Sequence, residues 1–209
     1  MKQKGNYSKD NILIRQMKLY WKSFSIVGSL LYTLFILVAC GNTEYEFSSK
    51  PCFFIFDNST HNDPTLAAAM TPYSGTYVTV TLTNHGGARY FKFSSNQGTS
   101  SESIFDGVDS RRSLILGMND GLIVGYGVLT DPVTFYAYDR ECPNCFSPDA
   151  LPVRSYPLHI NSTGIATCNT CNRKYDLNNG GILAEGEKGN KMTRYRASTT
   201  GPYGVLSVN

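Results

Sequence analysis

Apolar and polar residues alternate along the middle of the chain. In TYVTVTLT (76–83) every second residue from Val78 to Leu82 is aliphatic, and RYFKF (89–93) alternates in the same way. Successive side chains of a strand point to opposite faces, so a period of two residues predicts strands with one buried face. The connection between them, NHGGA, is rich in glycine, as hairpin turns are. The pattern therefore predicts a β-hairpin over residues 76–93.

The same reading extends to most of the chain after residue 50. Further strands are predicted at 113–116, 121–128, 133–139, 165–167, 173–177, 193–196 and 203–208. Fourteen tyrosines and eleven phenylalanines suit pleated, half-buried surfaces. The pattern predicts a mainly β domain, built as a sandwich or barrel-like stack of small antiparallel sheets.

Two segments depart from the strand pattern. TLAAAM (65–70) is the best helix candidate, because Asp63 can cap its N-terminus and Pro64 fits the first turn. Residues 94–112 are polar with few strand-forming side chains, and we expect a long loop there.

The N-terminal 39 residues have a different composition. They hold six basic residues and one acid, and an uncharged apolar run then extends from Ser23 to Thr43. This layout is typical of an export signal, although a run of about 20 apolar residues can also span a bilayer. The sequence LVAC, ending at Cys40, resembles the lipobox of bacterial lipoproteins, in which the chain is cut before a cysteine that receives lipid.

The resemblance implies a domain organisation. Residues 1–39 would be a lipoprotein signal peptide, with 1–16 upstream of a true start at Met17. Residues 40–50 would be the lipidated Cys40 and a polar tether, and residues 51–209 the β domain. We therefore expect a protein of the bacterial cell envelope, on the periplasmic or outer surface, bound to a membrane through its N-terminal lipid.

Removing the signal changes the charge of the chain. The 19 basic and 16 acidic residues of the full sequence fall to 13 and 15, a net charge of −2. The basic character belongs to the signal, and nothing in the remaining composition indicates nucleic-acid binding.

Four of the six cysteines form two pairs of equal spacing. Cys142 and Cys145 make one Cys-x2-Cys pair, Cys168 and Cys171 make the other, and 22 residues lie between the pairs. A two-residue gap lets both sulfurs turn toward one point, and two such pairs complete a tetrahedron around a metal ion. Three chemistries fit: a mononuclear site, with Zn²⁺ favoured over Fe; a four-cysteine [2Fe–2S] cluster; or disulfides, which export to an oxidising compartment allows.

The residues around the pairs add a family resemblance. A predicted strand precedes Cys142-Pro143, and the second pair leads into Arg173-Lys174-Tyr175-Asp176-Leu177 and then Gly180-Gly181. This order resembles the Rieske iron–sulfur domain, in which two ligand-bearing loops precede an aromatic-Asp-Leu stretch and closing strands. The resemblance covers about residues 132–209. It implies two metal-binding loops at the tip of the fold, here within residues 140–177.

The chain departs from the Rieske pattern at the ligands. A Rieske centre takes two cysteines on one iron and two histidines on the other. Asn144 and Cys171 stand at the two histidine positions, and none of His61, His85 or His159 is near either loop in the sequence. These residues cannot build that centre, and a four-cysteine set on a Rieske-like scaffold remains.

Three functions follow from these alternatives. The first is a binding or scaffold module with a structural metal, the second is electron transfer, and the third is an interaction module held by disulfides. No nucleophile–base pair, phosphate loop or histidine cluster indicates an enzyme, and the sequence names no protein or redox partner.

The sequence also predicts the environment of several other residues. Arg140, Arg173 and Lys174 flank the cysteines and would offset the charge of a thiolate site, or would be ordinary exposed residues. Tyr175 and Leu177 are expected in the core, and Cys52 is expected to be buried in the first strand. The carboxylates of residues 139 and 141 are expected to be solvated loop charges.

Overall fold

The structure, a computed structural model, describes residues 45–209. The predictions about the export signal, the start at Met17 and the lipidated Cys40 fall on residues 1–44, outside the described residues. Residues Glu46–Asn209 form one unit.

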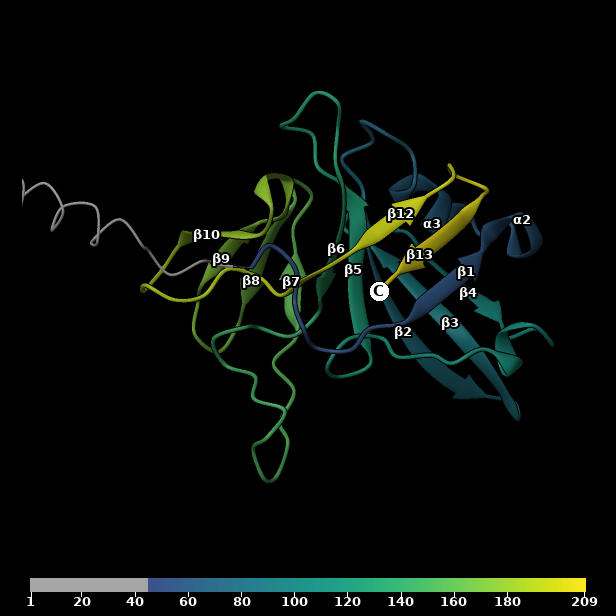
Figure 1. The fold of residues 1–209 in the computed structure, drawn as a ribbon, viewed down its shortest axis with the longest axis horizontal. Helices are drawn as coiled ribbons and strands as arrows, with labels where there is room; N and C mark the ends of the chain where they lie inside the picture. The colour runs from purple at the N-terminus through teal and green to yellow at the C-terminus, as the bar shows by residue number, and fades with distance from the viewer. Residues whose placement is uncertain (1–44) are drawn as a thin grey trace, which may run out of the picture. The chain divides into compact units, whose positions relative to one another are not determined.

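A six-stranded antiparallel sheet forms the centre of this unit (Figure 1). Its order is β11-β6-β5-β2-β3-β4, with β2 Tyr77–His85, β3 Ala88–Ser95, β4 Ser100–Ile104, β5 Gly121–Tyr126, β6 Phe135–Asp139 and β11 Arg194–Tyr195. The predicted hairpin is confirmed, because Val80 pairs with Phe93 and His85 with Ala88.

The two faces of this sheet belong to two separate cores. One face presents side chains that include Val78, Val80, Leu122, Val124 and Ala137. The other face presents Tyr77, Ile123, Tyr136 and Tyr138. Strand β5 is buried along residues 121–125 because it lies inside the sheet with a core on each side, which explains its nearly continuous apolar sequence.

A three-stranded sheet covers the first face. It has the order β1-β13-β12, with β1 Phe54–Asp57, β12 Ala197–Thr199 and β13 Val205–Val208. Phe54, Phe56, Leu206 and Val208 are fully buried in this core with Phe93 of the long sheet.

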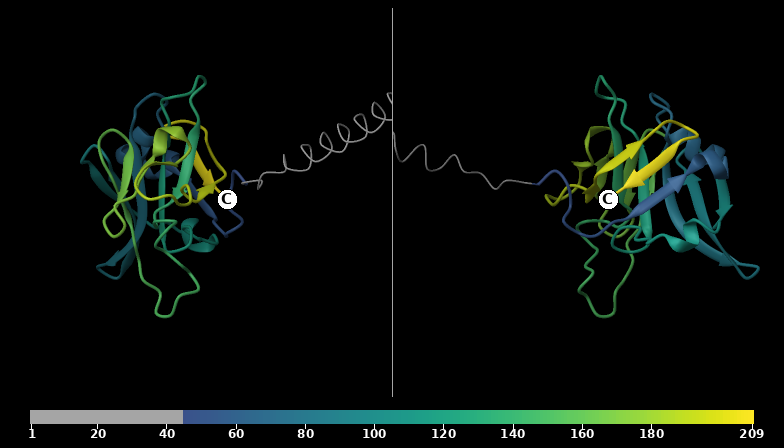
Figure 2. Two further views of the ribbon diagram at one scale, coloured as in Figure 1. Left: turned by 90° about the vertical axis from the view of Figure 1, so that its left-hand side faces the viewer. Right: turned by 45° about the vertical axis from the view of Figure 1, so that its right-hand side comes forward.

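A four-stranded sheet faces the second core and carries the second cysteine pair. Its order is β10-β9-β8-β7, with β7 Leu158–Ile160, β8 Ile165–Cys168, β9 Lys174–Asp176 and β10 Ile182–Glu185. The pair lies at the end of β8 and in the turn that follows it. Residues 140–193 form an insertion between β6 and β11, which pair with each other in the long sheet through Tyr138 and Arg194. Within the insertion, the segment 147–156 extends away from the sheets as a long loop (Figure 2), and Leu151 in it is 95% exposed.

The predicted helix is confirmed as α3, Pro64–Ala69, which is capped by Asp63 through a 2.9 Å bond from the Leu66 N–H. A short helix that the pattern did not predict, α2, spans Asn58–His61. It follows β1 directly, and the Asp57 carboxylate caps it by accepting a bond from the Ser59 N–H.

Two predictions about local structure were wrong. Residues 94–112 are not one loop, because β4 pairs with β3 and a 3₁₀ helix, η1, spans Asp109–Arg111. Serines dominate β4, so its sequence lacks the apolar alternation that marks a strand. Residues 113–116 form no strand beyond an isolated bridge between Ile115 and Phe53.

The fold class predicted from the pattern is confirmed: the described chain is mainly β and consists of several small antiparallel sheets. In residues 45–209 no helix has the length and apolar character needed to cross a bilayer.

Candidate metal centre

Each Cys-x2-Cys pair lies on a tight turn. In the first, the N–H groups of Cys145 and Phe146 bond to the carbonyl of Cys142 at 3.2 and 2.9 Å. The second is the β8–β9 connection, where the Asn172 N–H bonds to the carbonyl of Cys168 at 2.9 Å. Asn172 has a φ of 57°, a left-handed conformation that asparagine tolerates better than most residues. Both turns thus direct two sulfurs to one side.

The four sulfurs converge on one point. Their Sγ atoms all lie within 4.8 Å of one another. Cys142 Sγ is 3.7 Å from Cys171 Sγ, and Cys145 Sγ is 3.8 Å from Cys168 Sγ. Four sulfurs at about 2.3 Å from a tetrahedral Zn²⁺ would be about 3.8 Å apart. The described cysteines therefore fit the coordination shell of a single ion.

These distances are not those of disulfides. Sulfur atoms 3.7 and 3.8 Å apart are far beyond the ~2.05 Å of an S–S bond. The five cysteines of residues 45–209 are all free thiols. Cys52 is the fifth; it is buried in the other core, as expected, although it lies just before β1 and not in it, and burial raises its pKa to about 11.

Burial raises the pKa of Cys142 and Cys145, whereas hydrogen bonds to sulfur lower the pKa of Cys171. Burial acts to raise the pKa of Cys171, but the backbone N–H and the guanidinium of Arg173 bond to its sulfur, and the pKa is lowered to about 6. Burial raises the pKa of Cys142, against the effect of bonds from the Tyr175 hydroxyl and the Asn144 N–H. A metal ion adds a much stronger field of the same sign and deprotonates coordinating thiols outright.

Asn144 and Tyr175 brace the first pair. The Asn144 side chain donates to the Tyr175 hydroxyl at 2.8 Å and to the Asn190 carbonyl at 2.9 Å, and it accepts from the Asn190 N–H at 2.8 Å. Because the Tyr175 oxygen accepts from Asn144, its own proton is available to Cys142 Sγ, 3.4 Å away. Asn144 stands at a histidine position of the Rieske pattern, and here it connects the first turn to the segment before β11.

The centre lies at the border of the core. Cys142 and Cys168 are buried with Tyr175, Leu177 and Met192, whereas Cys145 and Cys171 are half-buried. The prediction that Tyr175 and Leu177 are core residues is confirmed, since neither is exposed to solvent. One side of the cluster is thus sealed by the second core, and the other approaches the surface.

Only one of the three flanking cations is found to interact with a cysteine. Arg173 bonds to the Cys171 sulfur and also donates to the Glu187 carbonyl at 2.8 Å. Lys174 instead pairs with Glu185 at 2.6 Å on the exposed side of the small sheet, and Arg140 lies 3.6 Å from the carboxylate of Glu141.

The prediction that residues 139 and 141 carry solvated charges was wrong. Asp139 and Glu141 are 0% and 1% exposed. Asp139 accepts bonds from the N–H of Met118 and the hydroxyl of Tyr195, and burial raises its pKa.

Glu141 has a comparable set of partners just before the first cysteine. It accepts from Asn119 Nδ2 at 2.7 Å, from Ser155 Oγ at 2.5 Å and from the Tyr156 N–H. The two carboxylates therefore fix the backbone that leads into the first cysteine turn.

Comparisons with protein-family models, with curated proteins and with solved structures found no match. The main indication of function is therefore the sulfur geometry. The described structure has a four-cysteine cluster that can hold a metal ion.

Proposed function

We propose that residues 51–209 are a Rieske-like domain whose four cysteines bind one structural Zn²⁺, in a lipoprotein anchored to the bacterial cell envelope through Cys40. The metal joins the two cysteine turns of the inserted segment and makes the domain a stable binding or scaffold module. A closed four-thiolate site has no open coordination position for a substrate.

The single observation that carries the proposal is the compactness of the cluster, in which all four sulfurs lie within 4.8 Å of one another. On one tetrahedral ion all ligand pairs are equivalent, and 3.7 and 3.8 Å agree with the edge of that tetrahedron. On a two-iron cluster, sulfurs on different irons are separated further by the iron–iron spacing. The upper limit of 4.8 Å for all pairs favours the mononuclear site.

The Rieske likeness gains support from topology. Both cysteine turns lie in the segment inserted between paired strands of the larger sheet, and the second turn joins two strands of the small sheet, which is compatible with two loops at the tip of a β scaffold. The absence of a histidine at residue 144 or 171 makes a Rieske centre chemically impossible here, so the proposal is limited to the scaffold.

Electron transfer by a single iron is the second candidate, because Cys145 and Cys171 are half-buried. Such a centre near the surface would be accessible to a redox partner. Iron–thiolate centres absorb visible light and zinc–thiolate centres do not, so the absorption spectrum of the purified protein distinguishes them.

Elemental analysis tests the proposal on protein purified without added metal. We expect one zinc per chain and no visible absorption. A Cys145→Ser/Cys171→Ser variant should lose the metal and melt at a clearly lower temperature, because half of the coordination shell is removed. A Cys52→Ser variant is the matched control and should keep its zinc.

Two results would contradict the structural-zinc proposal. One is iron in place of zinc, which would favour electron transfer. The other is a metal-free protein as stable as the metal-loaded form, which would leave the cluster without a structural role. Thiol titration of the denatured protein should find all four cluster cysteines reactive.

A further inference from the structure

A second group of potential metal ligands lies at the first core, away from the cysteines. His61 ends α2, Asp109 begins η1, and Asp106 lies just before it in the chain. One ligand atom from each of these residues lies within 4.8 Å of the others. His61 Nε2 and Asp109 Oδ2 are 3.0 Å apart.

The imidazole of His61 is buried without a hydrogen-bond partner for Nε2. Its side chain is 7% exposed and that of Asp109 is 3% exposed. Although the two atoms are close, the ring nitrogen is not aligned with the carboxylate oxygen, and Nε2 has no hydrogen bond to any described residue. An unpaired buried polar atom costs about 1–3 kcal/mol, so this arrangement calls for a third atom between the ligands.

A metal ion accounts for both the short distance and the poor alignment. In octahedral coordination, two adjacent ligand atoms about 2.1 Å from the ion are about 3.0 Å apart. Each lone pair then points at the ion rather than at the other ligand. A neutral imidazole with two carboxylates also balances the charge of a divalent cation.

The three side chains are held in place by neighbours. The His61 ring stacks on Phe56 with 4.5 Å between centroids and 21° between planes. The Asp106 carboxylate accepts from the N–H groups of Val108 and Asp109 at 2.6 and 2.7 Å. Asp109 Oδ2 accepts from the Asp106 N–H at 3.0 Å. Such support from packing and hydrogen bonds is typical of preorganised metal ligands.

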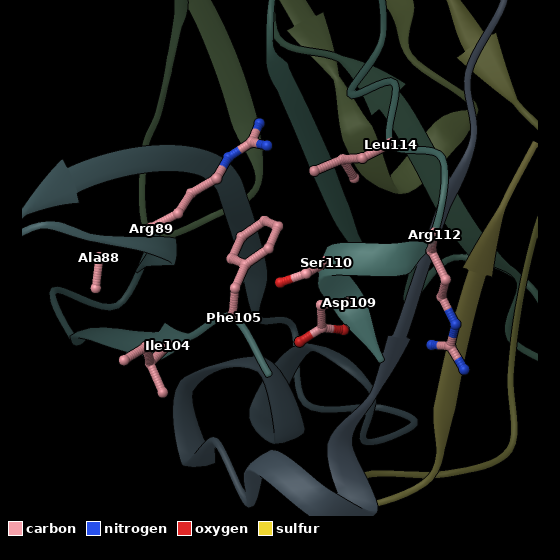
Figure 3. A pocket seen from close by; sticks show the side chains of 8 residues that line it. All are labelled: Ala88, Arg89, Ile104, Phe105, Asp109, Ser110, Arg112 and Leu114. Atoms are coloured by element: carbon pink, nitrogen blue, oxygen red, sulfur yellow. The ribbon is translucent and has the colours of Figure 1, made fainter. Parts of the chain in front are cut away.

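Asp109 also lines a neighbouring cavity, which His61 and Asp106 do not line. The cavity has a volume of about 300 Å³ and is bordered by Arg89, Phe105, Arg112 and Leu114 (Figure 3). Arg89 lies over the Phe105 ring at 4.8 Å. With three protein ligands, an ion keeps open positions for water or a small anion.

We propose that His61, Asp106 and Asp109 bind a divalent first-row transition-metal ion in an open site. Its donors, one imidazole and two carboxylates, are harder than thiolates and therefore accept Mn²⁺ as well as Zn²⁺ or Co²⁺. The site is chemically distinct from the four-cysteine cluster, which prefers soft ions, and it does not depend on what that cluster holds.

Manganese binding by the full-length chain in detergent tests this site. Free Mn²⁺ gives an electron paramagnetic resonance signal that decreases on binding, and we expect one bound Mn²⁺ per chain. Asp106→Asn should weaken binding by about 100-fold or more, since removing supporting residues alone costs 10–100-fold. His61→Gln should have the same effect.

The controls separate ligand loss from unfolding. Asp106→Asn keeps a side-chain oxygen that can accept hydrogen bonds from the Val108 and Asp109 N–H groups. In the absence of metal, this variant should therefore melt near the temperature of the parent protein. Asp149→Asn and His159→Gln change exposed residues and should bind Mn²⁺ as the parent does. The proposal is overturned if the parent binds no Mn²⁺, or if both ligand variants bind it with unchanged affinity.

Discussion

The two cores on either side of the long sheet are built from different side chains. The core under β1, β12 and β13 is rich in phenylalanine, with Phe54, Phe56, Phe91 and Phe93 buried. Among the described residues, the core under the inserted sheet has no buried phenylalanine and is richer in tyrosine and cysteine, with Tyr77, Tyr136, Tyr138 and Tyr175 around Cys142 and Cys168.

The difference does not come from strand length. The sheet that covers each core is made of strands of three or four residues. Short strands bury little apolar area, so a small sheet needs another source of stability. In the phenylalanine core the main contribution is the packing of buried rings, and the second core combines packing with polar bonds, such as the 2.9 Å bond from the Tyr138 hydroxyl to the Leu177 carbonyl, and with the proposed four-cysteine metal.

Metal removal should cause the largest loss of stability, and this loss should be confined to the core under the inserted sheet. Binding to structural zinc sites is worth about 10–16 kcal/mol in isolated peptides, which sets an upper limit here. After treatment with a strong chelator, amide hydrogen exchange should accelerate within 140–193 and remain slow in β2 and β5. Equal acceleration in both regions would show that the two cores do not differ in their dependence on the metal.

Truncation of a side chain in the phenylalanine core should lower the stability of the protein without releasing the metal. Phe93→Ala should lower the free energy of unfolding by about 3–5 kcal/mol, because a fully buried ring is lost and a cavity remains. Urea denaturation measures this change. The zinc content of the folded fraction should stay at the parent level, and Phe53→Ala, which changes a ring that is 39% exposed, should cost far less. Loss of zinc from folded Phe93→Ala protein would show that packing in the phenylalanine core affects metal binding at the other core.

Removal of the Tyr175 hydroxyl should cause the smallest loss of stability. Tyr175→Phe removes the partner of Asn144 and of Cys142 Sγ while keeping the ring, and should cost about 1–2 kcal/mol. Zinc should also be released to a chelator faster than from the parent. Tyr203→Phe, at a tyrosine that is 53% exposed, is the control. An unchanged release rate would mean that the hydroxyl does not support the first cysteine turn.

Features set by neighbours in the sequence were predictable. The alternation in residues 76–83 predicted β2 because strand side chains follow a fixed period, and Asp63-Pro64 predicted the start of α3. The cysteine cluster was predictable for the same reason: each turn is local, and only the meeting of the two turns required the fold.

Features set by distant partners were not predictable. Asp139 and Glu141 can be buried because Asn119, Ser155 and Tyr195 donate hydrogen bonds to them. No local sequence pattern predicts such distant partners. The approach of His61 to Asp109 depends in the same way on how the region around β4 folds back. The serine-rich β4 was missed because edge strands with polar faces lack the apolar signal.

The chain leaves the long sheet at β6 and returns to it at the adjacent β11. The entrance and exit of the inserted segment are thus side by side, so the segment can be exchanged, shortened or lengthened while the strand pairing of the host sheet is kept. Such an arrangement lets evolution, or a protein engineer, replace one metal-binding segment by another, provided that the new segment also covers Tyr77, Tyr136 and Tyr138 of the long sheet.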